Sequence, residues 1–185
     1  MHRAAEHTGR RMSHITALAA GALVVLAPVL AGCDPSPAPT PTPTAAFASE
    51  EEAFAEAEKV YRAYNEAGNA RNAGLTEPEP QQFLVGEAPE RDIDAQNTFA
   101  AHGLSVSGEV VVTGFKPVSA DTNDIRGSVI GIVCLDVSKV ALLDARGVDV
   151  TPADRPDMVA QRVTFVGRSG QLIIIREATE DISSC

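Results

Sequence analysis

Residues 126–137 of the chain read RGSVIGIVCLDV, and this stretch is the strongest indication of the fold. It is rich in valine and isoleucine, which favours a β-strand with apolar side chains on both faces. Alternation along such a strand places Ile130, Ile132, Cys134 and Asp136 on one face of the sheet. The pattern does not say whether that face is the concave one.

Further segments with strand character lie on both sides of this stretch. They are residues 106–117, 140–143, 158–166 and 172–177. Turn-forming residues separate the segments, at 121–124 before the quoted strand and at 167–170 before the last one. Together the longer segments predict a four-stranded antiparallel meander.

Helical patterns precede the strands. Ser49 and Glu52 have the spacing of a capping box, and apolar residues then recur at helical intervals as far as Gly68, which we expect to end the helix. A second helix is expected over residues 89–103, with Ile93, Phe99 and Ala100 on its buried side. Helices followed by antiparallel strands predict an α+β fold, in which N-terminal helices pack on a curved four-stranded antiparallel sheet.

The first 32 residues have the parts of an export signal: arginines, then an apolar stretch, then small residues. The run Leu30-Ala31-Gly32-Cys33 resembles the bacterial lipobox, in which the cysteine is alkylated by diacylglycerol and becomes the first residue of the mature protein. The resemblance implies that Cys33 attaches the protein to the lipid bilayer, at the outer face of the cytoplasmic membrane. The alternative, a membrane-spanning helix, would need about 20 apolar residues, and residues 15–32 fall slightly short and include Pro28.

Residues 33–48 would hold the lipidated cysteine and a linker in which proline alternates with small residues, a composition that predicts an extended spacer. Residues 49–185 would then form a single extracytoplasmic domain. The chain carries a formal net charge of −10, which is poorly suited to binding nucleic acid. We therefore expect no nucleic-acid partner.

The chain has three cysteines. With Cys33 assigned to lipid, Cys134 and Cys185 remain in an oxidising compartment, where a pair favours a disulfide. The competing interpretation is that the two thiols bind a metal ion. Zinc sites usually need four ligands, so the disulfide is favoured and no metal site is expected.

The helix pair, the antiparallel strands and the run Cys134-Leu135-Asp136-Val137-Ser138 with a final Cys185 resemble the actinobacterial lipoproteins that contain a nuclear-transport-factor-2-like domain. The resemblance covers residues 49–185. It implies a cone-shaped sheet closed by the first helix. The wider superfamily includes isomerases, dehydratases and non-catalytic binding domains, so the resemblance leaves the activity open.

Three residues are candidates for a pocket inside such a cone: Tyr61 and Tyr64 on the first helix and Asp136 on the quoted strand. A carboxyl group in an apolar pocket could act as a general base. The alternative is that Asp136 ends its strand at the rim and binds nearby backbone or Ser138, while the tyrosines belong to the core. No catalytic residue is assigned on this basis.

Two functions remain open. The favoured one is a non-catalytic binding or scaffolding module that meets an unidentified ligand or protein of the cell envelope. The other is an isomerase- or hydrolase-like enzyme with a small-molecule pocket and a buried carboxyl. No phosphate-binding loop is present, and His102 is the one histidine after the leader, so we expect no cofactor. A homodimer formed through the open face of the sheet is compatible with either function.

Overall fold

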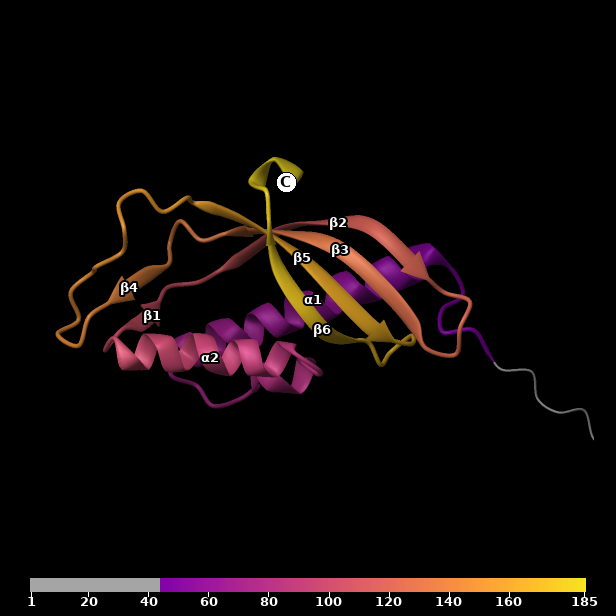
Figure 1. Cartoon of the computed structure of the whole chain (residues 1–185), viewed down its shortest axis with the longest axis horizontal. Helices are drawn as coiled ribbons and strands as arrows, with labels where there is room; N and C mark the ends of the chain where they lie inside the picture. The colour runs from indigo at the N-terminus through magenta and orange to yellow at the C-terminus, as the bar shows by residue number, and fades with distance from the viewer. Residues whose placement is uncertain (1–43) are drawn as a thin grey trace, which may run out of the picture. The chain divides into compact units, whose positions relative to one another are not determined.

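The computed structural model describes residues 44–185, which form two helices and two antiparallel sheets (Figure 1). The expected α+β class is therefore confirmed, whereas the export signal, Cys33 and most of the linker lie outside the described residues. The elements are α1 (Glu50–Asn72), η1 (Pro80–Phe83), α2 (Ala88–Ala101), β1 (Ser105–Ser107), β2 (Val111–Asp121), β3 (Gly127–Asp136), β4 (Ala141–Leu143), β5 (Met158–Gly167), β6 (Ile173–Glu180) and η2 (Ile182–Ser184).

The main sheet has four antiparallel strands in the order β2-β3-β5-β6, as the sequence predicts. Strands β1 and β4 pair with each other in a separate two-stranded sheet. The predicted strand over residues 106–117 is thus divided between two sheets. Gly108 lies at the division with a positive φ of 89°, and a side chain there would collide with the backbone of Lys139. Only glycine fits this position without strain.

Helix α1 begins with the predicted capping box. The Ser49 side chain accepts a hydrogen bond from the backbone N–H of Glu52, whose carboxylate accepts one from the backbone N–H of Ala48. The predicted end at Gly68 is wrong, because the helix ends at Asn72, two residues before Gly74, which has a positive φ of 81°. Glycine tolerates the left-handed conformation that terminates a helix, and Gly68 has an ordinary helical one.

The core lies between α1 and one face of the main sheet. Helix α1 contributes the buried residues Ala53, Ala57 and Tyr61. The facing strands contribute Val129, Val133, Val163, Phe165 and Ile174, all of them completely buried. Small alanine side chains let the helix lie close to the strands. This helix therefore covers the sheet from the side on which the odd-numbered residues of β3 point.

The predicted buried side of α2 is wrong. Ile93 is 45% exposed, Ala100 is exposed and Phe99 is half-buried. The helix is held instead by Asp92, which accepts two hydrogen bonds of 2.9 Å from the guanidinium of Arg71 on α1. This charge-assisted pair joins α2 to α1, and Ala88 at the start of α2 is the α2 residue that is buried in the apolar core.

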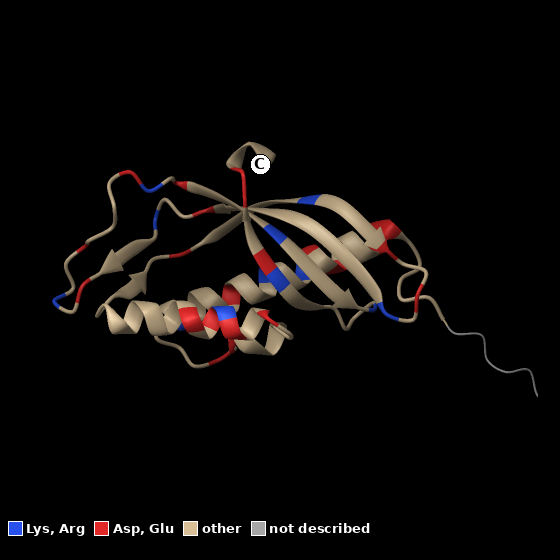
Figure 2. Cartoon of the chain, viewed as in Figure 1, with Lys and Arg blue, Asp and Glu red and all other residues tan. Residues whose placement is uncertain are grey.

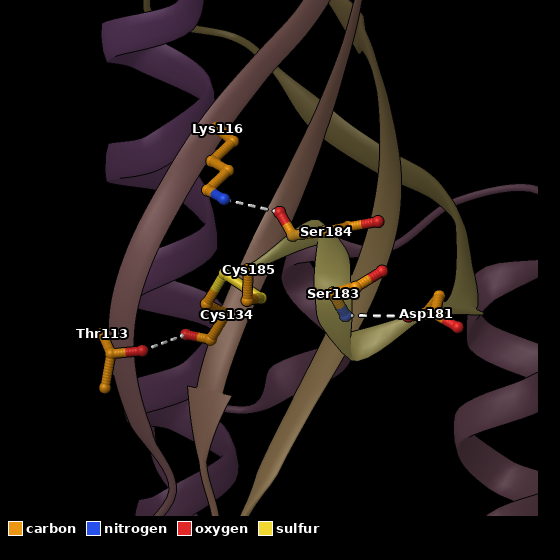
Figure 3. Close-up of a disulfide and its surroundings, with 7 residues drawn as sticks. All are labelled: Thr113, Lys116, Cys134, Asp181, Ser183, Ser184 and Cys185. Carbon is orange, nitrogen blue, oxygen red and sulfur yellow. Dashed lines mark hydrogen bonds between the residues drawn. A yellow bond between two sulfur atoms is a disulfide. The ribbon is translucent and has the colours of Figure 1, made fainter.

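The C-terminus is fastened to the other face of the sheet. Cys134 on β3 and Cys185 form a disulfide, with the two Cα atoms 5.7 Å apart (Figure 3). The nearby Lys116 Nζ donates a 2.7 Å hydrogen bond to the carbonyl oxygen of Ser184. The disulfide expected from the sequence is therefore present, and the two sulfurs are bonded to each other instead of to a metal. Between residues 44 and 185, no helix is long and apolar enough to cross a membrane.

Candidate functional site

A cavity of about 260 Å³ opens between the C-terminal half of α1 and the sheet end where β3 and β6 finish. Its walls come from α1, from the segment before β2, and from β3, β5 and β6. The lining residues are Tyr61, Tyr64, Asn65, Gly68, Asn69, Arg71, Asn72, Val110, Leu135, Gln161 and Glu177. Tyr61 and Tyr64, the two tyrosines of the chain, are both among them.

Glu177 faces this cavity because β6 contains a β-bulge. Phe165 of β5 is opposite Ile174 and Thr164 is opposite Arg176, so Ile175 is an extra residue with no partner. The bulge shifts the alternation of β6, and Glu177 then pairs with the buried Val163 on the side of α1. Regular alternation from Ile174 would have turned Glu177 away. A bulge commonly re-aims a side chain in this way next to a functional site.

The Glu177 carboxylate is held by tyrosine hydroxyls. The Tyr64 hydroxyl donates a 3.0 Å hydrogen bond to Oε2 of Glu177, and the ring of Tyr61 lies edge-on to that of Tyr64 with centroids 5.6 Å apart. Burial raises the pKa of Glu177, while hydrogen bonding from Tyr64 and Tyr61 partly offsets the shift. Burial, and next the Glu177 charge, raises the pKa of both tyrosines, which therefore stay protonated donors.

Two asparagines hold one wall of the cavity in place. The side-chain amides of Asn65 and Asn69 donate hydrogen bonds of 2.9 and 2.8 Å to the carbonyl oxygen of Val110. The Asn69 side-chain oxygen in turn accepts one of 3.0 Å from the backbone N–H of Val110. These contacts fasten the segment before β2 to α1, so the wall is formed before any ligand arrives.

Arg71 lines the cavity, but its charge is balanced by Asp92. Asp92 has a side chain 9% exposed, and it also accepts hydrogen bonds from Gln81 and Gln96, of 3.1 and 2.8 Å. Hydrogen bonding to Asp92 raises the pKa of Arg71, so the guanidinium stays charged. Glu177 forms no ion pair with any other described residue, and its charge is the uncompensated one at this site.

A second cavity, of about 440 Å³, lies between α2 and strands β5 and β6. It shares Tyr64, Gln161 and Glu177 with the first. The remaining lining residues are Ala88, Arg91, Asp92, Ala95, Ala178 and Thr179. Glu177 therefore borders two adjoining spaces, and a ligand that reaches it from one can extend toward the other.

Asp136 lines neither of these cavities, so of the two interpretations of this residue the structure agrees with the one in which it ends its strand and binds Ser138. Strand β3 pairs with β5 without a register shift, so Asp136 shares the face of Ile132 and Cys134, which are buried outside the α1 cluster. Asp136 ends the strand, and its Oδ1 accepts a 2.8 Å hydrogen bond from the backbone N–H of Ser138. Hydrogen bonding by Ser138 lowers the pKa of Asp136, which favours a permanently charged surface carboxylate.

Sequence reasoning missed Glu177, although one signal was available. Residues 172–175 are all large and aliphatic, so regular alternation would expose half of them. Such a run at the end of a strand is consistent with a bulge that changes the inward-facing parity. His102 is exposed at the end of α2, with Nδ1 2.8 Å from the carbonyl oxygen of Thr98. Among residues 44–185, no group of three or more His, Cys, Asp or Glu side chains could hold a metal ion.

Comparisons with known proteins add little to this description. Neither a scan against protein-family models nor a search of curated proteins gave a match. Among solved structures, the chain is similar to the intermembrane space region of the chloroplast protein ARC6, with a TM-score of 0.46 and 13% sequence identity. That alignment covers 68% of this chain and 95% of the other. Similarity at this level defines neither a family nor an activity.

Proposed function

We propose that this chain is a lipid-anchored protein whose domain acts as a non-catalytic binding module at the outer face of the cytoplasmic membrane. The lipobox-like sequence at Cys33 and the proline-rich linker support the location. The cavity around Glu177 supports the binding role, and it is the observation on which the proposal depends. The ligand or partner would be a component of the cell envelope.

The construction of the cavity favours binding because its polar groups are already in position. Asn65 and Asn69 hold the wall, Asp92 holds Arg71, and Tyr64 orients Glu177. A preformed site loses little conformational entropy when a ligand enters, which increases its affinity. The carboxylate, the tyrosine hydroxyls and the Gln161 amide would determine which ligand is accepted.

We further propose the nuclear-transport-factor-2-like cone as the finer description of the fold. The register shifts in β2 and β6 support it, because bulges bend a strand and help a sheet to curve. The placement of the cavity between the first helix and the sheet also agrees with a cone closed by that helix.

The anchor and the binding role can be tested together on the full-length protein, produced in a bacterium that processes lipoproteins. We expect the protein in the membrane fraction and Cys33→Ala in the soluble fraction. Native mass spectrometry of the detergent-extracted protein should show a bound small molecule. That molecule should be diminished in Glu177→Gln but not in Asp136→Asn, a matched carboxylate on the opposite face. Unchanged membrane association of Cys33→Ala would refute the anchor.

A second candidate function is favoured by one observation, the raised pKa of Glu177. A buried carboxyl with such a shift could serve as a general base in an isomerase- or hydrolase-like reaction. The same experiment separates the two functions. A binding module returns the released molecule with its mass unchanged after incubation, whereas an enzyme accumulates a product and loses that conversion in Glu177→Gln.

A further inference from the structure

The charge inside the cavity indicates the chemistry of its ligand. Glu177 is a largely buried carboxylate, and the groups that hydrogen-bond to it are the neutral hydroxyls of Tyr64 and Tyr61. The two arginines that line the adjoining cavities each have an acidic partner. Arg71 is bound to Asp92, and the exposed Arg91 on α2 is 3.5 Å from the carboxylate of Glu87, which also pairs with Arg176. The cavity of about 260 Å³, which Arg91 does not line, therefore presents the Glu177 charge without a paired cation among the described residues.

We infer that this pocket binds a small organic cation, of the alkylammonium class, with Glu177 as its counter-ion. The inference deepens the proposed binding function and depends on it. An ionised carboxylate has two oxygens, each able to accept more than one hydrogen bond. Tyr64 occupies Oε2 only in part, so an ammonium group can donate to the carboxylate while the Tyr64 contact remains.

The aromatic residues of the site suit the same ligand. Tyr61 and Tyr64 line the cavity beside Glu177, and tyrosine rings attract cations electrostatically, more strongly where water is excluded. The burial that raises the pKa of Glu177 reflects the cost of an uncompensated charge. A bound cation would remove that cost, whereas an anion would increase it.

The size of the cavity limits the ligand. A volume of about 260 Å³ lies just below the range of about 300–1,000 Å³ that is usual for drug-sized ligands. Leu135 and Val110 provide apolar wall for a short alkyl chain. The adjoining cavity, which shares Glu177 and Gln161, gives a longer chain a second direction in which to extend. A compact ammonium group with a short tail fits this arrangement.

The negative charge of Glu177 in the cavity is distinct from the acidic residues on the rest of the domain. Acidic residues occur on both helices and in the loops, with lysines and arginines among them (Figure 2). The recognition of a cation would thus be specific to the cavity. An exposed carboxylate such as Asp136 would show little of it, because salt and water screen surface charges.

Because both tyrosines line the cavity, ligand binding there can be followed by tyrosine fluorescence. The chain has no tryptophan, and both of its tyrosines line the cavity, so tyrosine fluorescence of the full-length protein reports this site alone. The probes are n-butylammonium chloride, 1-butanol and sodium butyrate at constant ionic strength. We expect a saturable change in emission with butylammonium and none with butanol or butyrate. Glu177→Gln should weaken butylammonium binding about tenfold or more, and Asp136→Asn should leave it unchanged.

Each other outcome contradicts a stated part of the argument. If butanol or butyrate binds as tightly as butylammonium, the cation inference is wrong while the binding function stands. If none of the three probes gives a saturable change, both the inference and the binding role of the cavity are wrong. Equal affinity for butylammonium in Glu177→Gln, with a native circular dichroism spectrum, would also overturn the inference. The comparison of probes on the unaltered protein needs no variant to fold.

Discussion

Removing the disulfide should lower the free energy of unfolding by about 4 kcal/mol. The bond joins residues 51 positions apart, and the chain-entropy relation converts a closed loop of that length into a loss of about 14 cal/mol/K in the unfolded state. At 25 °C this corresponds to about 4 kcal/mol. A single domain is stable by only about 5–15 kcal/mol in total, so the double variant Cys134→Ala with Cys185→Ala should be marginally stable.

The measurement is urea unfolding followed by far-UV circular dichroism, on the oxidised protein, the reduced protein and the double alanine variant. Reduction and substitution should give similar losses. Both should also steepen the dependence on urea, because opening the loop lets the unfolded chain expose more surface. As a control, reductant should not change the double variant, which has no disulfide to lose.

A loss below about 1 kcal/mol would refute this reasoning, since the loop length alone predicts four times as much. A loss well above 4 kcal/mol would indicate a further native-state contribution. The natural source would be the contact between Lys116 and Ser184, which depends on the C-terminal segment staying against the sheet.

Other predictions concern two glycines and the pocket carboxylate. Gly131→Ala would drive its Cβ into the ring of Phe115 and should cost about 1–3 kcal/mol in urea unfolding. Gly68→Ala, with no atom within 4 Å of the added carbon in α1, should instead stabilise by about 0.5–1 kcal/mol; the same sign at both positions would contradict the packing described. Glu177→Gln removes a carboxyl whose folded-state pKa is raised above 4.5, so the wild type should lose stability relative to this variant as pH rises from about 4.5 through the folded-state pKa. Parallel stability curves for the two proteins over that interval would show that Glu177 is not desolvated.

The order of the strands and the disulfide could be predicted because their signals are local. Valine and isoleucine on consecutive positions mark β3, turn residues bound it, and two cysteines in an oxidising compartment pair readily. The start of α1 was equally clear, since a capping box needs only Ser49 and Glu52 at the right spacing. Each of these features depends on neighbouring residues or on composition.

The end of α1 and the docking of α2 depend on distant residues, and these predictions were wrong. Gly68 resembles a helix stop, but the helix continues through it to Asn72, and its neighbour Ala67 is buried. The apolar residues Ile93 and Ala100 resemble a buried stripe, yet both are exposed, while Asp92 contacts Arg71 of α1 and Ala88 reaches the core. Neither the end of α1 nor the buried side of α2 can be predicted without knowing which residues of the rest of the fold contact these helices.

Of the candidate site residues, the two tyrosines could be predicted from the sequence, whereas the place of Asp136 depends on contacts between distant elements. Tyr61 and Tyr64 lie on a regular helix, where spacing alone assigns the face. For Asp136, alternation gave its face of the strand but not which face meets the helix, and the odd-numbered residues of β3 are the ones that face α1. The prediction that Ile132, Cys134 and Asp136 share one face of β3 was right. Which face of the sheet packs against α1 could be learned from the structure alone.

The bulge at Ile175 determines the sign of the charge in the pocket, because it decides which residues of β6 point toward α1. Without the extra residue in the ladder, the same sequence would turn the guanidinium of Arg176 toward α1 and the carboxylate of Glu177 toward solvent. The pocket would then attract anions with no change in composition. Related chains with one residue more or fewer in β6 could therefore differ in the sign of the ligand they prefer while keeping the same fold.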